Sequence, residues 1–223
     1  MKIAAVIPIR FKDCCAPDGK PKRTLSGKPL WAITLDQALA AKTLDKVIVA
    51  YDDDAFLPHC EPWSGKIEAL KRPEALSRKG VTTLDVLAFV AETRGDNDYF
   101  MLLEITHPLR PKGIIDQMIA AAEAQKVDSL ITCHPVHYTF WRRDEHGRMG
   151  RIAGTGDRAQ VALFQELTGI GSVFSAEALR GDDPFGGHVD VVPIERFWAA
   201  IDVRDDDGLW LAEQYLKRTG AKL

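Results

Sequence analysis

Short apolar runs alternate with longer segments of helical periodicity through the first part of the chain. The apolar runs are rich in branched side chains and cover residues 3–9, 46–50, 99–103 and 129–133. The helical patterns lie between them and cover residues 29–41, 82–92 and 113–124. Runs that are apolar on both faces are typical of buried parallel strands, so the alternation predicts βαβ units around a mostly parallel sheet.

This alternation stops after residue 133. Residues 134–168 are rich in aromatic, arginine and glycine residues and show no sustained period, which predicts an excursion from the sheet. Strand character returns at residues 170–174 and 189–193, and a helical pattern follows over residues 208–217. At 223 residues the chain suits one α/β domain spanning residues 1–223, with the excursion inside it.

Composition narrows the class of protein. The net charge is −3, with basic and acidic residues spread along the chain, which argues against a general nucleic-acid binder. No apolar stretch reaches the length of a membrane span, and the first apolar run is too short for a secretory signal. The four cysteines lack metal-binding spacing. We therefore expect a cytoplasmic protein with free thiols and neither a membrane nor a nucleic-acid partner.

A basic loop follows the first predicted strand, at the sheet edge where ligands bind in open parallel sheets. Its cations, interleaved with Gly19 and Gly27, are Arg10, Lys12, Lys20, Lys22, Arg23 and Lys28. Glycines let backbone N–H groups approach phosphate oxygens, and lysine and arginine offset the phosphate charge. The loop therefore predicts a triphosphate site, although its spacing matches neither a P-loop nor a dinucleotide-binding turn. A solvated basic loop is the simpler alternative for such a charge run.

Acidic residues follow three of the predicted elements and suggest a magnesium site. They are Asp52 to Asp54 after the second strand, Glu104 after the third, and Asp202 with Asp205 to Asp207 near the end. Phosphoryl chemistry uses Mg²⁺ held by one or two carboxylates and by phosphate oxygens. For Asp53, Asp54, Asp206 and Asp207, helix capping is the better explanation. We expect Asp202 to point from an ordered segment into the site.

A third cluster combines Arg72 and Pro73 with Thr82 and Thr83 at the start of a predicted helix. The N–H groups and hydroxyls at a helix N-terminus can bind a base or a phosphate. Capping alone accounts for either threonine, so the sequence leaves both interpretations open.

In their order along the chain, these segments resemble the cytidylyltransferases that activate acidic sugars, namely N-acylneuraminate (CMP-sialic acid) synthetases and their legionaminic, pseudaminic and Kdo relatives. IAAVIPIR resembles the opening strand of that family, and GKPKRTLSGKPL resembles its loop, with Lys20 seven residues before a Gly-Lys-Pro. LDKVIVAYDDD, KRPEALSRKGVTT, LLEITHPLR and DSLITC are similar to the segments that follow. IDVRDDDGLWLAE is similar to the closing Asp-x-Asp motif.

The resemblance implies a Rossmann-like nucleotidyltransferase fold with a mostly parallel mixed sheet, and a homodimer whose partner is reached by the excursion at 134–168. It implies the reaction of CTP with an acidic nine-carbon sugar to give CMP-sugar and pyrophosphate, with Mg²⁺. The catalytic residues implied are Arg10, Lys20 and Asp202, and the metal ligands implied are Asp202 and Asp205. Nucleotide contacts are implied for Arg10, Lys12, Lys20, Asp52, Arg72 and Thr83. Acceptor contacts are implied for Glu104, Thr106, Arg158 and Gln160.

This sequence departs from the family pattern where metal and sugar meet. Arg204 replaces the second aspartate of the closing motif, and Glu104 replaces a glutamine. Arg204 removes an expected metal ligand, and a carboxylate at residue 104 repels an acidic sugar unless it is paired. Two alternatives therefore stay open: a nucleotidyltransferase with another base or acceptor, and a non-catalytic dimeric nucleotide-binding protein.

Overall fold

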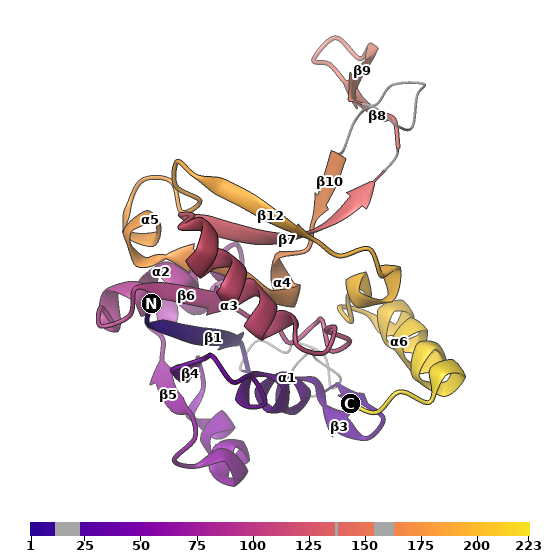
Figure 1. Ribbon diagram of the computed structural model, residues 1–223. Helices are drawn as coiled ribbons and strands as arrows, with labels where there is room; N and C mark the ends of the chain where they lie inside the picture. Colours follow the sequence, from indigo (N-terminus) through magenta and orange to yellow (C-terminus); the bar gives the residue numbers. More distant parts are fainter. Residues whose placement is uncertain (12–22, 137, 154–162) are drawn as a thin grey trace.

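The first apolar run forms β1 (Ile3–Ile9), an inner strand of the sheet in the computed structural model (Figure 1). The model describes residues 1–11, 23–136, 138–153 and 163–223. Because successive side chains of a strand point to opposite faces, Ile7 packs into one buried cluster and Val6 into another. Both faces of β1 are therefore covered, as the unbroken apolar run predicts.

The main sheet has eight strands in the described part of the chain, in the order β10-β7-β11-β6-β1-β4-β5, with β12 also paired to β7. Its remaining strands are β4 (Lys46–Tyr51), β5 (Glu68–Lys71), β6 (Tyr99–Leu102), β7 (Ser129–Val136), β10 (Leu163–Glu166), β11 (Ser172–Ser175) and β12 (Val189–Pro193). Strand β1 pairs in parallel with β4 and β6, and β4 pairs in parallel with β5. The predicted strand at 170–174 is β11, which runs antiparallel to β6 and β7 and makes the sheet mixed.

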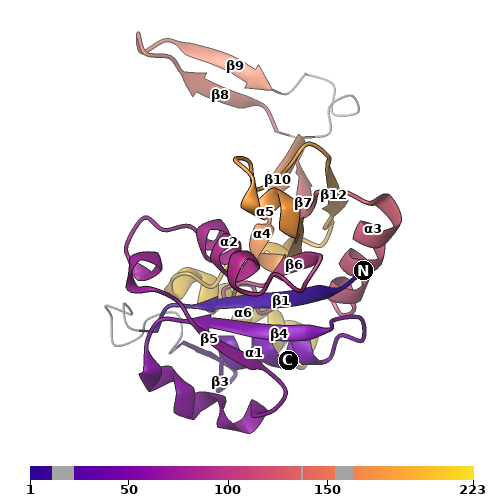
Figure 2. The ribbon, with the colours of Figure 1, turned by 90° about the vertical axis from the view of Figure 1, so that its left-hand side faces the viewer.

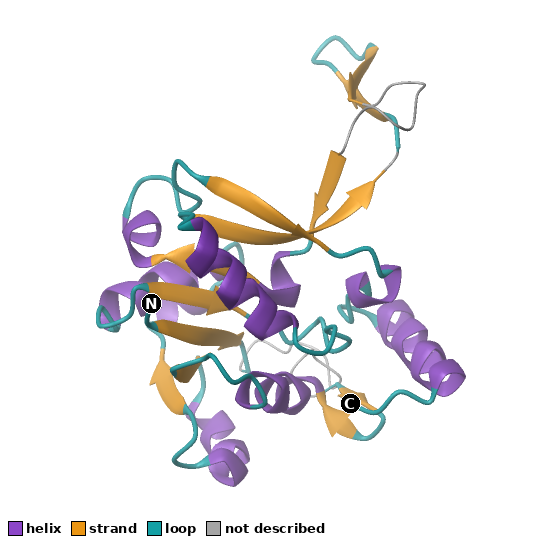
Figure 3. Cartoon of the chain, in the orientation of Figure 1, coloured by secondary structure: helices purple, strands orange, loops and turns teal. Residues whose placement is uncertain are grey.

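Helices cover both faces of this sheet (Figure 3). Their bounds are α1 (Leu30–Leu39), α2 (Thr83–Thr93), α3 (Ile114–Gln125), α4 (Thr168–Gly171), α5 (Ala176–Arg180) and α6 (Asp206–Thr219). The apolar sides of α1, α3 and α6 share a cluster with one face of the sheet, and α2 and α5 pack on the other. The predicted helices at 29–41, 82–92, 113–124 and 208–217 are confirmed with small shifts of their ends.

The excursion contains a two-stranded hairpin that projects from the body of the protein (Figures 1 and 2). Strand β8 (Phe140–Arg143) pairs with β9 (Met149–Ala153), while β7 and β10 lead the chain out and back. Large apolar side chains on this part of the chain are exposed, including Tyr138 at 72% and Trp141 at 58%. The shape fits an element that reaches beyond its own domain, and its role in a dimer stays a prediction.

The segment between β4 and α2 is only partly predicted by the hydrophobic pattern. It contains the 3₁₀ segments η2 (Asp54–Trp63) and η3 (Glu74–Ser77) and the edge strand β5. Asp53 caps η2 by accepting a hydrogen bond from the Ala55 amide at 2.9 Å, as expected. Asp54 instead forms an ion pair with Lys71. Strand β5 has a charged residue at each end and only two apolar residues between them, which hides it from a search for apolar runs, because an edge strand buries only part of its surface.

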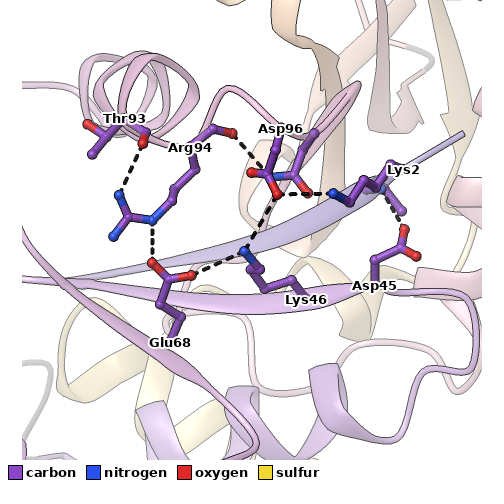
Figure 4. Close-up of polar contacts among 9 residues, drawn as sticks. Lys2, Asp45, Lys46, Glu68, Thr93, Arg94 and Asp96 are labelled. Atoms are coloured by element: carbon purple, nitrogen blue, oxygen red, sulfur yellow. Dashed lines mark hydrogen bonds and ion pairs between the residues drawn. The ribbon is translucent and has the colours of Figure 1, made fainter.

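A surface network of charges lies at the amino ends of the parallel strands (Figure 4). The Lys2 ammonium lies 3.0 Å from Asp96, the Lys46 ammonium lies 3.3 Å from Glu68, and Arg94 also pairs with Glu68. Exposed pairs of this kind each contribute about 0–1 kcal/mol. The network stabilises the edge of the sheet opposite to the one where ligands bind.

Two further expectations from the composition can be compared with the structure. No helix in the described ranges is both long and apolar enough to cross a membrane. Cys60 and Cys133 are buried free thiols, and burial raises the pKa of each to about 11. The expectation for Cys14 and Cys15 falls outside the described residues.

Helix α6 begins in close contact with the backbone of residue 202. A Cβ atom added at Gly208 would lie 2.1 Å from the Asp202 carbonyl oxygen, so no other residue fits there without a backbone shift. We predict that Gly208→Ala lowers the free energy of unfolding by about 1–3 kcal/mol, the usual cost of overpacking. Urea denaturation measures the change.

The matched control is Gly150→Ala, where an added Cβ meets no atom within 4 Å. That substitution should change the free energy of unfolding by less than about 0.5 kcal/mol. Equal effects of the two substitutions would contradict the proposed backbone contact.

Candidate active site

A cavity of about 370 Å³ lies beyond the carboxyl end of β6, against the N-terminus of α2. Four segments distant in sequence line it: residues 82–84, the loop after β6 at Glu104 and His107, residues 165–169, and the segment after η4 (Phe197–Ala200) with Asp202 and Arg204. This is the sheet edge where the sequence predicts the ligand. It brings together Thr83, Glu104 and Asp202 of the predicted site residues.

Thr82 is the N-cap of α2, and Thr83 is the first residue of the helix. The Asp85 amide donates to the Thr82 hydroxyl at 3.1 Å, and the Asp85 carboxylate accepts from the Thr82 amide at 2.7 Å. These reciprocal bonds form a capping box that satisfies the first turn of the helix. Thr82 therefore caps the helix, and both Thr82 and Thr83 line the cavity.

Arg204 connects two of the three carboxylates that line the cavity, Glu104 and Asp202, and the third is Glu166. The Nε of Arg204 lies 2.5 Å from an Asp202 oxygen, and its Nη2 lies 3.8 Å from a Glu104 oxygen. Glu104 and Asp202 are mostly buried, while the Arg204 side chain is 58% exposed. The carboxylate of Glu104 is therefore paired, which removes the simplest objection to an anionic ligand in this cavity.

The predicted metal ligands Asp202 and Asp205 are both engaged in other contacts. Asp205 is the N-cap of α6 and accepts from the Gly208 amide at 2.8 Å, so the cap is one residue earlier than Asp206 and Asp207, where we expected it. Asp202 is paired with Arg204. Within the described ranges, no group of three histidine, cysteine, aspartate or glutamate side chains is placed to hold a metal ion. The residues present do not fit a magnesium site built on Asp202 and Asp205.

Asp52 and Arg72 are buried beneath the start of the basic loop. Asp52 accepts a hydrogen bond from the Phe11 amide at 2.6 Å, and its other oxygen lies 3.6 Å from the Arg72 guanidinium. Arg72 also donates to the Ile9 carbonyl at 3.3 Å. These contacts fix the direction in which the chain leaves β1, so both residues have a structural role. The nucleotide contact predicted for them stays a prediction.

Arg10 is exposed at the start of that loop and donates to the Arg78 carbonyl at 3.3 Å. The carbonyl belongs to the segment just before α2, so this contact links the end of β1 to the helix that borders the cavity. The predicted sites at Lys12, Lys20, Arg158 and Gln160 lie outside the described residues.

The acceptor contact predicted for Thr106 stays a prediction, and Thr106 itself lies behind the residues that line the cavity. It is buried, its carbonyl accepts from the Val203 amide at 2.7 Å, and its hydroxyl lies 3.2 Å from His107 Nδ1. The contact with Val203 holds the segment between Asp202 and Arg204 against the loop after β6. Its role is therefore to support the wall.

His107 lines the cavity and stays uncharged at neutral pH. Burial lowers the pKa of its imidazole to about 3, and the positive charges of Arg110 and Arg204 act in the same direction. A Cβ atom on Gly169 would lie 2.4 Å from His107 Nδ1, so glycine is required where these two walls meet. A neutral imidazole can both donate and accept hydrogen bonds, which suits contact with sugar hydroxyls.

Arg110 organises the wall, and the sequence reasoning did not single it out. Its buried guanidinium donates to the carbonyls of His107, Gly169 and Ile170 at 2.6–2.8 Å, and also to the Glu104 carbonyl. Burial lowers its pKa to about 9, opposed by the charge of Glu104, so it remains a cation at pH 7. Four carbonyls from two segments thus converge on one side chain.

We predict that Arg110→Met lowers the free energy of unfolding by about 3 kcal/mol or more, because buried carbonyls lose their donors. The matched control is Arg94→Met, which removes the surface contact with Glu68 and should cost about 1 kcal/mol or less. Chemical denaturation of both variants measures the difference. Similar losses for the two would show that Arg110 does not hold the wall together.

We also predict a pH dependence that originates in His107. Its folded pKa of about 3 lies below its ordinary value of 6.5, so the unfolded chain binds the extra proton between these values. Its contribution to stability is complete above about pH 6.5 and is lost as the pH falls, at about 1.4 kcal/mol per pH unit.

The variant His107→Gln should therefore lose about 2 kcal/mol less than wild type between pH 7 and pH 5. Unfolding free energies at both pH values measure this difference, with His146→Gln, at the exposed turn of the hairpin, as the control. Parallel pH profiles for wild type and His107→Gln would contradict the prediction.

Solved structures of cytidylyltransferases share this fold. CMP:2-keto-3-deoxy-manno-octonic acid synthetase complexed with CTP has a TM-score of 0.72 at 14% identity, over 98% of this chain and 99% of that one. The 4-diphosphocytidyl-2C-methyl-D-erythritol synthase of Anaerococcus prevotii has a TM-score of 0.71 at 17% identity, over 97% and 96%. At these identities the likeness establishes the nucleotidyltransferase fold alone.

Sequence relatives are similar over rather more than half of the chain. An N-acylneuraminate cytidylyltransferase of Streptococcus agalactiae is 31% identical over 134 residues, which are 59% of this chain and 32% of that protein. An 8-amino-3,8-dideoxy-manno-octulosonate cytidylyltransferase of Shewanella frigidimarina is 32% identical over 124 residues, 55% of this chain and 48% of that protein. The matched part thus covers about a third of the first relative's length and about half of the second's. Residues 4–144 match the cytidylyltransferase family model, and the chain belongs to the cytidylyltransferase family.

Proposed function

We propose that this protein transfers CMP from CTP to an acidic nine-carbon (nonulosonic) sugar and releases pyrophosphate. The observation that carries the proposal is the cavity beyond the carboxyl end of β6, where the α2 N-terminus, the loop after β6 and the closing segment meet. These are the segments whose sequence resembles the sugar-activating cytidylyltransferases. The names of two relatives refer to N-acylneuraminate and to an amino-octulosonate, both acidic sugars, which supports an acidic sugar as the acceptor, and the nine-carbon length follows the first of them.

In the proposed reaction the anomeric hydroxyl of the sugar attacks the α-phosphate of CTP in line, and the bond to the β-phosphate breaks. Arg10, Lys12 and Lys20 would offset the phosphate charge, and the base would lie near Thr83 and Arg72. Positioning and charge neutralisation supply most of the rate in such transfers. Arg10 is suitably placed at the end of β1, where its side chain is exposed.

The acceptor would occupy the cavity between Glu104 and the 165–169 wall. Glu104 and the neutral His107 line the cavity and can bind sugar hydroxyls. Arg158 and Gln160 are proposed to contact the acceptor as well. We propose that magnesium enters with CTP, held by phosphate oxygens, as nucleoside triphosphates usually carry it. A homodimer formed through residues 134–168 is part of the same proposal, supported by the exposed aromatic side chains near the hairpin.

One observation favours a second candidate function. The ion pairs of Arg204 with Asp202 and Glu104 replace the two-aspartate arrangement of the family's closing motif. A protein that binds CTP and a sugar without turning them over, or one that uses another base or acceptor, would tolerate this change.

Pyrophosphate release distinguishes these candidates. We expect release with CTP and Mg²⁺ when the acceptor is neuraminic, legionaminic or pseudaminic acid, and less with Kdo, ATP, GTP or UTP. Arg10→Ala should lower kcat/KM by about 10²–10³, the usual effect of losing one donor to a developing anion. Arg218→Ala, exposed in the last turn of α6, should leave it unchanged.

Release with another nucleotide in preference to CTP would replace the proposed base. Tight CTP binding by calorimetry, without release for any acceptor, would support the non-catalytic candidate instead.

A further inference from the structure

The cavity contains a cation that belongs to the protein itself. Glu104 and Asp202 approach it from two different segments, and Arg204 lies between them with ion pairs of 3.8 Å and 2.5 Å. A divalent ion bound by the protein at this point would need carboxylate oxygens as ligands, and these two carboxylates line the cavity. The guanidinium group is in contact with both.

The atoms that make these contacts show how firmly the position is filled. Asp202 faces Nε of Arg204, and Glu104 faces Nη2, so one edge of the planar guanidinium is shared between two carboxylates. Arginine keeps its charge at any physiological pH and holds its donors in a fixed fork. Because the side chain is tethered, a free ion must displace it from both carboxylates at once.

The third carboxylate of the cavity, Glu166, accepts a hydrogen bond from the Thr168 hydroxyl. Asp205, the other expected ligand, accepts a hydrogen bond from the Gly208 amide at the start of α6, and loss of that bond would leave the first turn of the helix uncapped. Recruiting Asp205 to an ion would therefore weaken the element that positions Asp202, because Gly208 packs directly on the Asp202 carbonyl.

We propose that Arg204 is the resident cation of this cavity and takes the place that a protein-bound divalent ion would otherwise occupy between Glu104 and Asp202. The protein without nucleotide then holds no divalent ion at this position. The proposal concerns ion binding by the nucleotide-free protein, so it stands or falls independently of the proposed transfer reaction.

Binding of Mn²⁺, followed by the loss of the free-ion signal in electron paramagnetic resonance, tests the proposal on nucleotide-free protein. Wild type should show no stoichiometric site. Arg204→Gln should gain one Mn²⁺ site, with an affinity on the order of tenfold or more above wild type, because two carboxylates lose their cation. Arg204→Lys keeps the charge and should behave as wild type.

Two further variants locate the site. Adding Glu104→Gln to Arg204→Gln should abolish the gained site. Arg148→Gln removes a comparable exposed ion pair with Asp144, at 3.3 Å on the hairpin, and should gain no site. Thermal unfolding establishes that each variant is folded.

The proposal is overturned if Arg204→Gln is folded and gains no Mn²⁺ site, or if Arg204→Lys gains the same site. It is also overturned if wild type binds one Mn²⁺ that Asp202→Asn removes. This last comparison needs only wild type and Asp202→Asn, so it can overturn the proposal even if Arg204→Gln does not fold.

Discussion

The buried guanidinium of Arg110 is the contact on which the shape of the cavity depends. The loop after β6 and the turn before β11 both leave the regular hydrogen-bond pattern of the sheet, so their carbonyls need other donors. Arg110 supplies those donors to Glu104 and His107 on one side and to Gly169 and Ile170 on the other. An apolar residue could fill the same space but would remove a donor from each of these carbonyls, at a cost larger than the packing gained.

The electrostatics of the cavity follow from this arrangement. A charged imidazole would face the positive charges of Arg110 and Arg204, and burial disfavours the charged form further, so His107 is neutral. Glu104 is paired with Arg204, and its charge opposes the fall in the pKa of Arg110. The cavity therefore offers a neutral imidazole and three carboxylates beside one exposed guanidinium. That combination is suited to the hydroxyl groups of a polyhydroxylated ligand.

Most of the fold could be predicted from the sequence, because apolar runs and helical periods record burial directly. Strands β1, β4, β6, β7 and β12 and the four long helices are found this way. The antiparallel direction of β11 could not be, since an apolar strand has the same pattern in either orientation. Arg110 was missed because an arginine next to a proline in a loop is ordinarily exposed, and only the converging carbonyls give it a buried role. The arginine at position 204 was visible as unusual in the sequence, but its ion-pair partners could be identified only from the structure.

Asp205 and Arg204 show why a motif can keep its position and change its chemistry. The closing segment has to begin α6, and that helix needs a cap, which Asp205 provides through the Gly208 amide. It also has to present Asp202 to the cavity, which the contact between Val203 and Thr106 ensures. Both requirements concern the backbone and are met whatever side chain stands at residue 204. That position is therefore free to vary in charge without loss of the fold. An arginine there forms ion pairs with Glu104 and Asp202, two carboxylates that could otherwise bind an ion. The backbone contacts conserve the geometry of the site, while the side chain at residue 204 decides which cation it contains.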